Sequence, residues 1–216
     1  MIKTNFIYLL KIVFITCSFY SSFSSTAQIV ELDWLKGMQT RWSHSINEVV
    51  SDANKNVFVI GYFTGRVDLD PGPGAQFFIP TVDSGDADVF IQKFDSTGQL
   101  LWIKTFGGEE YDAPVSADMD AQGYLFIAGA FGGTVDFDPG PGKVMHTSTN
   151  SASGYLLKLD NNGNLVWVKV FKGYTGGFTV GSLSIDANQI VIGGYFNGDF
   201  DFDPGPAVER RNQSNY

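Results

Sequence analysis

The stretch that decides the fold is Val57-Phe-Val-Ile-Gly-Tyr-Phe-Thr-Gly-Arg-Val-Asp-Leu-Asp-Pro-Gly-Pro-Gly74. It returns twice, almost residue for residue, at positions 125–142 and 190–207. Equivalent residues are 68 and then 65 positions apart, and tryptophans outside the stretch keep this spacing, at Trp34, Trp102 and Trp167. Self-similarity at a fixed period indicates a repeat architecture.

One period predicts four strands, separated by turns rich in Asp, Asn and Gly. They are residues 114–120, 124–131, 155–159 and 165–171, which we name strands A, B, C and D. The A-to-B and C-to-D turns have the length and the glycine of tight hairpins. No stretch shows a sustained helical period, and 25 glycines punctuate the chain. Along the whole chain this pattern predicts eleven strands, which begin with a D and end with a B.

Strand B is almost continuously apolar in each copy, as expected of a strand that is covered on both faces. Stacked four-stranded blades supply such cover. The sequence therefore predicts an all-β fold of β-propeller type, with antiparallel blades and about two and a half to three repeats of 65–68 residues. A β-sandwich is the alternative. The predicted repeats cover about 34–101, 102–166 and a truncated 167–216.

Eleven strands are too few to close a ring of four blades, so we expect an incomplete ring in this chain. Either the sequence is a fragment of a longer protein, or several chains assemble. Unclosed strand edges and apolar end faces favour self-association.

The B-to-C connections, about 64–87 and 132–152, exceed 20 residues. Connections of this length are often functional. In an antiparallel meander they emerge at the same end of the sheet as the D-to-A connections. We therefore expect the long acidic loops to share one face, which could contact a glycan, a protein or a divalent cation.

Residues 1–27 have the pattern of a secretory signal peptide: an early Lys3, an apolar run from Phe6 to Phe19, and a small-residue tail that ends at Ala27. Lys11 and the serines after Tyr20 make the run too short for a membrane-spanning helix. We expect cleavage near Ala27, a mature region of residues 28–216 without an integral membrane segment, and a secreted or cell-surface location.

Cys17 is the only cysteine, so the mature region has no thiol for disulfides or for nucleophilic catalysis. A lipoprotein would need small residues before Cys17, where Phe14-Ile15-Thr16 stands instead. Removal of the leader leaves 12 basic and 23 acidic side chains, a net charge of −11. Nucleic acid is therefore not an expected partner.

The repeated Asp-x-Asp-Pro-Gly motif is the candidate for a metal site. Two carboxylates two residues apart, beside the carbonyls of a turn, could give oxygen ligands to Ca²⁺. The alternative is a tight turn in which the aspartate accepts backbone hydrogen bonds. The spacing lacks the pattern of an EF-hand loop. The candidate calcium ligands are Asp68, Asp70, Asp136, Asp138, Asp201 and Asp203.

Nothing in the sequence requires an enzyme. The two histidines, His44 and His146, do not occupy equivalent positions of the repeat, and no triad-like constellation surrounds them. Glu109 and Glu110 are adjacent residues, which usually point apart and suit a solvated loop better than an acid/base pair. We expect the repeated tryptophans to pack between blades rather than to form a stacking platform for sugars or a quinone.

Residues 120–140 and the segment Lys158-Leu-Asp-Asn-Asn-Gly-Asn-Leu-Val-Trp167 resemble the bacterial beta-propeller repeat (SBBP-like) family of exported proteins. The resemblance covers nearly everything after the leader and implies a secreted or surface propeller. We thus expect an exported, non-catalytic binding or scaffold module. The alternative is a fragment of a propeller enzyme, a glycoside hydrolase or a quinone-dependent dehydrogenase, with its site in blades absent here.

Overall fold

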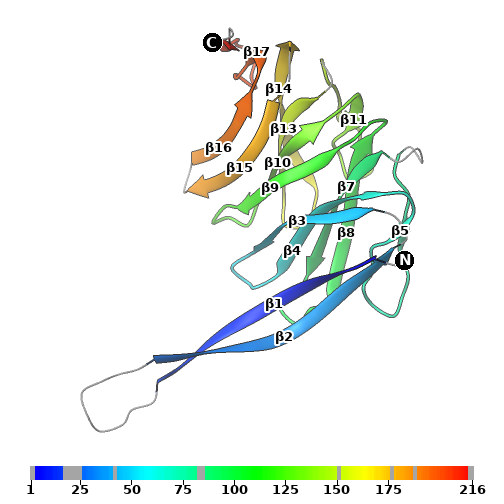
Figure 1. The fold of residues 1–216 in the computed structure, drawn as a ribbon, viewed down its shortest axis with the longest axis vertical. Helices are drawn as coiled ribbons and strands as arrows, with labels where there is room; N and C mark the ends of the chain where they lie inside the picture. The colour runs from blue at the N-terminus through cyan, green and yellow to red at the C-terminus, as the bar shows by residue number, and fades with distance from the viewer. Residues whose placement is uncertain are drawn as a thin grey trace.

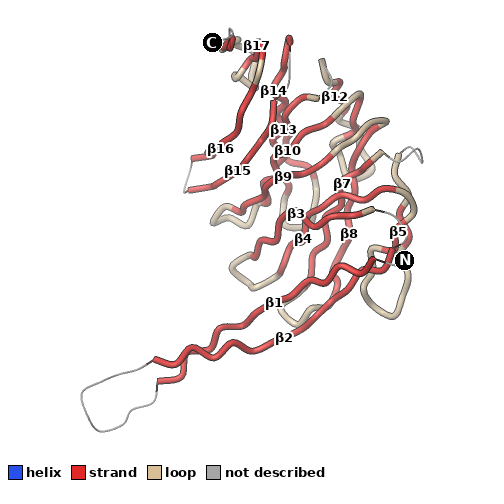
Figure 2. The backbone as a smooth tube through the Cα atoms, in the orientation of Figure 1, coloured by secondary structure: helices blue, strands red, loops and turns tan. Residues whose placement is uncertain are grey.

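The computed structural model describes residues 3–16, 26–40, 43–81, 86–149, 152–175, 178–186 and 189–213 (Figure 1). These residues form strands joined by turns and loops (Figure 2). None of them belongs to a helix long and apolar enough to cross a membrane. The fold is all-β, as the sequence predicts.

The eleven predicted blade strands are all present. They are β2 (Thr26–Thr40), β3 (His44–Ser51), β4 (Val57–Thr64), β7 (Ala87–Phe94), β8 (Leu100–Gly108), β9 (Ala113–Met119), β10 (Leu125–Phe131), β13 (Ser153–Leu159), β14 (Leu165–Thr175), β15 (Phe178–Asp186) and β16 (Gln189–Phe196). In chain order they are D, then A to D twice, then A and B.

Two four-stranded antiparallel blades are complete. The first contains β3, β4, β7 and β8, and the second contains β9, β10, β13 and β14, each in the order A-B-C-D. The third begins with the hairpin β15–β16. The ring is not closed, which agrees with an incomplete propeller.

The long B-to-C connections contain strands that the sequence analysis did not identify. They are β5 (Val67–Asp68) with β6 (Phe77–Phe78), β11 (Thr134–Asp136) with β12 (Met145–Thr147), and β17 (Gly198–Asp201) with β18 (Arg210–Gln213). Each hairpin turns back toward the preceding blade. There β11 pairs with β8, β17 pairs with β14, and β5 lies against β2.

Both complete sheets therefore have six strands, of which the outer two come from the next repeat. The acidic loops that sequence reasoning left without structure are hairpins that link consecutive blades. This arrangement places each Asp-x-Asp-Pro-Gly motif at the tip of a hairpin on the outer edge of a sheet.

The A strands of consecutive blades lie side by side at the inner edge. The Ser116 hydroxyl lies 3.4 Å from Glu48 Oε2 and accepts a hydrogen bond from the Leu183 amide at 3.1 Å. The Ile185 amide donates to Asp118 Oδ2 at 2.7 Å. Strands β3, β9 and β15 are thus joined in sequence by side chains, as in successive blades around an axis.

The main core lies between the first two sheets. Residues from both contribute, including Ile91 and Phe106 of the first and Ile127, Tyr155 and Leu157 of the second. Burial of apolar side chains is the dominant stabilising contribution to folding, at about 25 cal/mol per Å² of apolar surface removed from water.

The N-terminal strand β1 (Lys3–Thr16) pairs antiparallel with β2, and this hairpin extends past the blades in Figure 1. Beside β2, a strand D by its place in the repeat, β1 occupies the position that β7 and β13 occupy beside β8 and β14. The segment expected to be a signal peptide therefore includes β1. Cys17 lies outside the described residues, and the expected cleavage point at Ala27 falls within β2.

Candidate functional site

The three hairpin tips share one hydrogen-bond pattern. In the first tip, Asp68 Oδ1 accepts from the amides of Asp70 and Gln76 at 3.1 and 2.8 Å, and Asp70 Oδ1 accepts from Gly72 at 2.7 Å. The middle residue of the motif points the other way, because side chains alternate along a strand. Leu69 is fully buried in the core as a result.

The second and third tips repeat this arrangement. Asp136 accepts from the amides of Asp138 and Val144, and Asp201 accepts from those of Asp203 and Glu209, at 2.8 to 3.2 Å. The second aspartate of each motif accepts from the following glycine, Gly140 or Gly205, at 2.8 and 2.6 Å. The structure thus brings together the six candidate residues only in pairs, one pair to a tip.

The tip carboxylates have a turn-forming role in this geometry. One oxygen of the first aspartate holds both arms of the tip together, and the second aspartate is enclosed by its own turn: a Cβ added at Gly74 would lie 3.0 Å from Asp70 Oδ2. Ca²⁺ takes six to eight oxygen ligands. Within the described ranges, no group of three or more His, Cys, Asp or Glu side chains is placed to hold a metal ion. Calcium binding stays a prediction.

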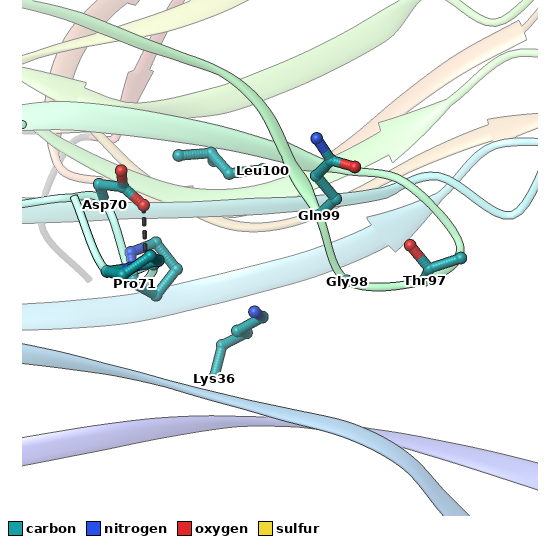
Figure 3. Close-up of a pocket in the computed structure, with 9 residues that line it drawn as sticks. Lys36, Asp70, Pro71, Thr97, Gly98, Gln99 and Leu100 are labelled. Carbon is teal, nitrogen blue, oxygen red and sulfur yellow. Dashed lines mark hydrogen bonds between the residues drawn. The ribbon is translucent and has the colours of Figure 1, made fainter.

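A polar groove of about 360 Å³ lies beside the first tip. Three separate segments line it: Lys36 of β2, the tip from Asp70 to Pro73, and the β7–β8 turn from Thr97 to Leu100. Figure 3 shows Lys36 rising from β2 into the space between Pro71 and the turn that carries Thr97 and Gly98. The groove therefore has a cationic donor, with the Asp70 carboxylate at the tip.

A second groove of about 180 Å³ lies beside the third tip. Its lining includes Asp203 of the tip and Lys169 of β14. Lys169 and Lys36 both stand two residues after the tryptophan of the repeat. Each groove is therefore lined by the same two repeat positions, this lysine and the second aspartate of the tip. His146 also lines this groove, and burial, together with the nearby Lys172, lowers its pKa. Neither groove was identified from the sequence, although the repeated Trp-x-Lys spacing was a signal for it.

The repeated tryptophans pack between consecutive blades, as predicted, in the two copies where a following blade covers them. Trp34 lies against the turn glycine Gly98 of the first blade, and Trp102 lies against Gly163 of the second; added Cβ atoms would come within 2.8 and 3.2 Å of the indoles. Trp167 differs, because it lines an open apolar groove.

A buried acidic pair lies at the end of the first sheet, and sequence reasoning missed it. Asp88 and Asp112 are 4% and 0% exposed. Asp112 accepts hydrogen bonds from the amides of Gly108 at 2.7 Å and Gly132 at 3.3 Å. A Cβ added at Gly107 would contact the Asp88 carboxyl group. The two acids therefore lie against adjacent glycines, Asp88 against Gly107 and Asp112 against Gly108.

Burial, assisted by the nearby Asp88 carboxyl group and opposed by the backbone hydrogen bonds from Gly108 and Gly132, raises the pKa of Asp112 to about 8. Burial also raises the pKa of Asp88 and of the nearby Tyr155. Asp112 joins the end of β8 to the turn after β10, which favours a structural role. The only sequence signal was a departure from the repeat, since Ser153 stands at the position equivalent to Asp88.

No family model matches this chain. Over 175 residues it is 27% identical to an uncharacterized WD repeat-containing protein of Acanthamoeba polyphaga mimivirus. The match covers 70% of this chain and 12% of the viral protein, so the chain spans about an eighth of the length of this relative. WD repeats are the sequence repeats of β-propeller blades. The chain is therefore similar to a repeat protein of propeller type, in agreement with its blades.

Proposed function

We propose that this chain is an exported, non-catalytic binding module of β-propeller type, which binds an extracellular glycan in the groove beside Asp70. The observation that carries the proposal is the groove itself. It is concave and polar, and three segments far apart in the sequence line it.

The groove offers the groups that recognise sugar hydroxyls. The Lys36 ammonium supplies donors, and the Gln99 amide supplies both a donor and an acceptor. The Thr97 hydroxyl donates to Asp95 Oδ1 at 2.7 Å, which leaves its lone pairs as acceptors directed by a fixed turn. A site of this kind binds by several oriented hydrogen bonds, and such pre-organisation reduces the ordering cost of association.

The export part of the proposal rests on the N-terminal pattern of residues 1–27 and on the resemblance to bacterial beta-propeller repeat proteins. Fractionation of cells that express residues 1–216 tests it. Mature protein that begins near Gln28 outside the cytoplasm supports export. Full-length protein that stays in the cytoplasm contradicts it.

The binding part is tested with residues 28–216 on a glycan array, followed by calorimetry of each hit. We expect Lys36→Ala and Gln99→Ala to weaken the hits about tenfold each, the loss expected from one charge-assisted or neutral hydrogen bond. Lys143→Ala is the matched control, because this exposed lysine lines neither groove. Hits that survive both groove substitutions, or an array without hits, contradict the proposal.

Calcium at the hairpin tips is a second ligand proposal, and it rests on the three Asp-x-Asp pairs. Calorimetric titration of residues 28–216 with CaCl₂ tests it directly, with melts in calcium and in chelator. A calcium stoichiometry that falls by one site in the Asp136→Asn, Asp138→Asn double variant supports metal sites. Identical melts without binding leave the tips as turns.

A further inference from the structure

The groove of about 180 Å³ beside the third tip lies on the side of β14 that faces the first blade. Its lining includes Val168 and Val170, which also pack into the core between the first two sheets. Trp167 and Phe171 alternate with these valines along β14 and line the apolar groove on the opposite face. His146 of β12, in the hairpin that extends the first sheet, completes the lining. Both sides of the groove thus belong to the two complete blades and the hairpins on their edges.

Two basic residues of this groove depart from the repeat. In the hairpin register, the position of His146 is occupied by Phe78 one repeat earlier. In the register between strand D and the following hairpin, the position of Lys172 is occupied by Gly107 one repeat earlier. The two aspartates of the tip, in contrast, are the same in all three copies. The second and third repeats therefore bring two basic side chains to one groove, where the repeat itself requires neither.

These two basic groups lack a counter-charge in the part of the chain that the structure describes. Lys172 is exposed and forms no salt bridge with a described carboxylate. Burial and the Lys172 ammonium both lower the pKa of His146, and no described carboxylate offsets them. Neighbouring groups of like charge disfavour each other's charged forms, and an anion between them reverses this effect.

The carboxylates of the tip are engaged with the backbone. Asp201 is 6% exposed, and its Oδ1 accepts from the amides of Asp203 and Glu209 at 3.1 and 2.8 Å. Asp203 Oδ1 accepts from the Gly205 amide at 2.6 Å. These hydrogen bonds form the turn, so the aspartates hold the tip in place and leave the ammonium of Lys172 unpaired.

We propose that this groove binds one oxyanion, a sulfate, phosphate or carboxylate group, between Lys172 and His146. The ammonium gives charge-assisted hydrogen bonds, and an imidazole N–H gives a second donor. Val168 and Val170 supply an apolar border, and a lower local dielectric strengthens such hydrogen bonds. The oxyanion is either a free ion or the acidic substituent of a larger molecule. The site uses neither Lys36 nor Asp70, so it does not depend on the proposed glycan groove.

The first experiment titrates the full chain with Na₂SO₄ at constant ionic strength and follows the histidine imidazole resonances by NMR. His44 is the only other histidine and does not line the groove, so it serves as the internal reference. The variant His146→Phe, which restores the residue type of the first hairpin, identifies the resonance. We expect a saturable shift of His146 with His44 unchanged. No saturable shift, or equal shifts of both histidines, overturns the proposal.

The second experiment removes one charge. Lys172→Gln keeps much of the side chain and loses the ammonium, so we expect sulfate binding to weaken about tenfold or more. Lys143→Gln is the matched control, because Lys143 is exposed and lines neither polar groove. Thermal melts confirm that both variants fold. Binding that is unchanged in Lys172→Gln, or equally weakened in Lys143→Gln, overturns the placement.

The third experiment identifies the source of the oxyanion. The same titration uses a sulfated oligosaccharide, a uronate oligosaccharide and inorganic phosphate. Tighter binding of a charged oligosaccharide than of the inorganic ions, lost in Lys172→Gln, supports an acidic substituent of a glycan. Equal binding of all of them supports a free ion. Lys36→Ala is expected to leave sulfate binding unchanged, so failure of the proposed glycan groove and failure of this site are distinguishable.

Discussion

The substitutions Trp102→Ala and Trp167→Ala remove the same side chain from equivalent positions of two repeats. The two tryptophans differ in how far the next blade covers them. Trp102 packs edge-to-face on Phe58, with ring centroids 5.8 Å apart, and the turn at Gly163 covers its other side. Trp167 packs on Phe126 at 5.9 Å, but its other side borders the open groove. Loss of a buried tryptophan costs about 3 to 5 kcal/mol. We expect about 3 kcal/mol for Trp102 and about half of that for Trp167.

Urea unfolding followed by far-UV circular dichroism measures both changes, because this signal comes mainly from the backbone and, unlike tryptophan fluorescence, is retained in both variants. Leu101→Ala and Val166→Ala are the controls: they change neighbours that are 49% and 47% exposed. Their free energies of unfolding should change by less than about 1 kcal/mol. Equal losses for the two tryptophan variants would refute the argument that a following blade covers only Trp102.

Three further predictions concern the turns and the buried acid. Asp136→Ala should lower the free energy of unfolding by about 1 to 2 kcal/mol in chelator, because two backbone amides lose their acceptor; unchanged melts would argue against the turn role. Gly163→Ala should destabilise more than Gly123→Ala in urea melts. Both glycines have positive φ, +77° and +84°, but only at Gly163 would the new Cβ crowd the indole of Trp102. The pKa of Asp112 is about 8 in the fold against 3.8 for the free side chain, so the native state holds the extra proton. Stability should therefore fall as the pH rises from about 4 to about 8, and urea midpoints of Asp112→Asn should show less of this fall.

The repeated blade strands could be predicted because they carry local signals. Apolar runs that end in Asp and Gly turns recur at a fixed period, and strands such as β10 and β14 begin within one residue of the expected positions. The tryptophan packing followed from the size of the side chain. These features depend on residues that are near one another in the sequence or that repeat.

The hairpins within the B-to-C connections could not be predicted in the same way. Strands β5 and β11 have two and three residues, and β11 pairs with β8, a strand of the preceding repeat. Such pairing depends on the placement of two blades, which the sequence does not specify locally. The Asp88–Asp112 pair is similar, since 24 positions separate residues that the end of β8 brings together.

Each repeat covers the one before it in two ways and its own strand B in a third. Its B-to-C hairpin extends the preceding sheet, its C-to-D turn covers the preceding tryptophan, and its strand C fills the groove beside its own strand B. In the third repeat the hairpin β17–β18 is present and pairs with β14, while the described residues provide neither the turn nor strand C. The exposure of β16 and the open side of Trp167 therefore have one cause.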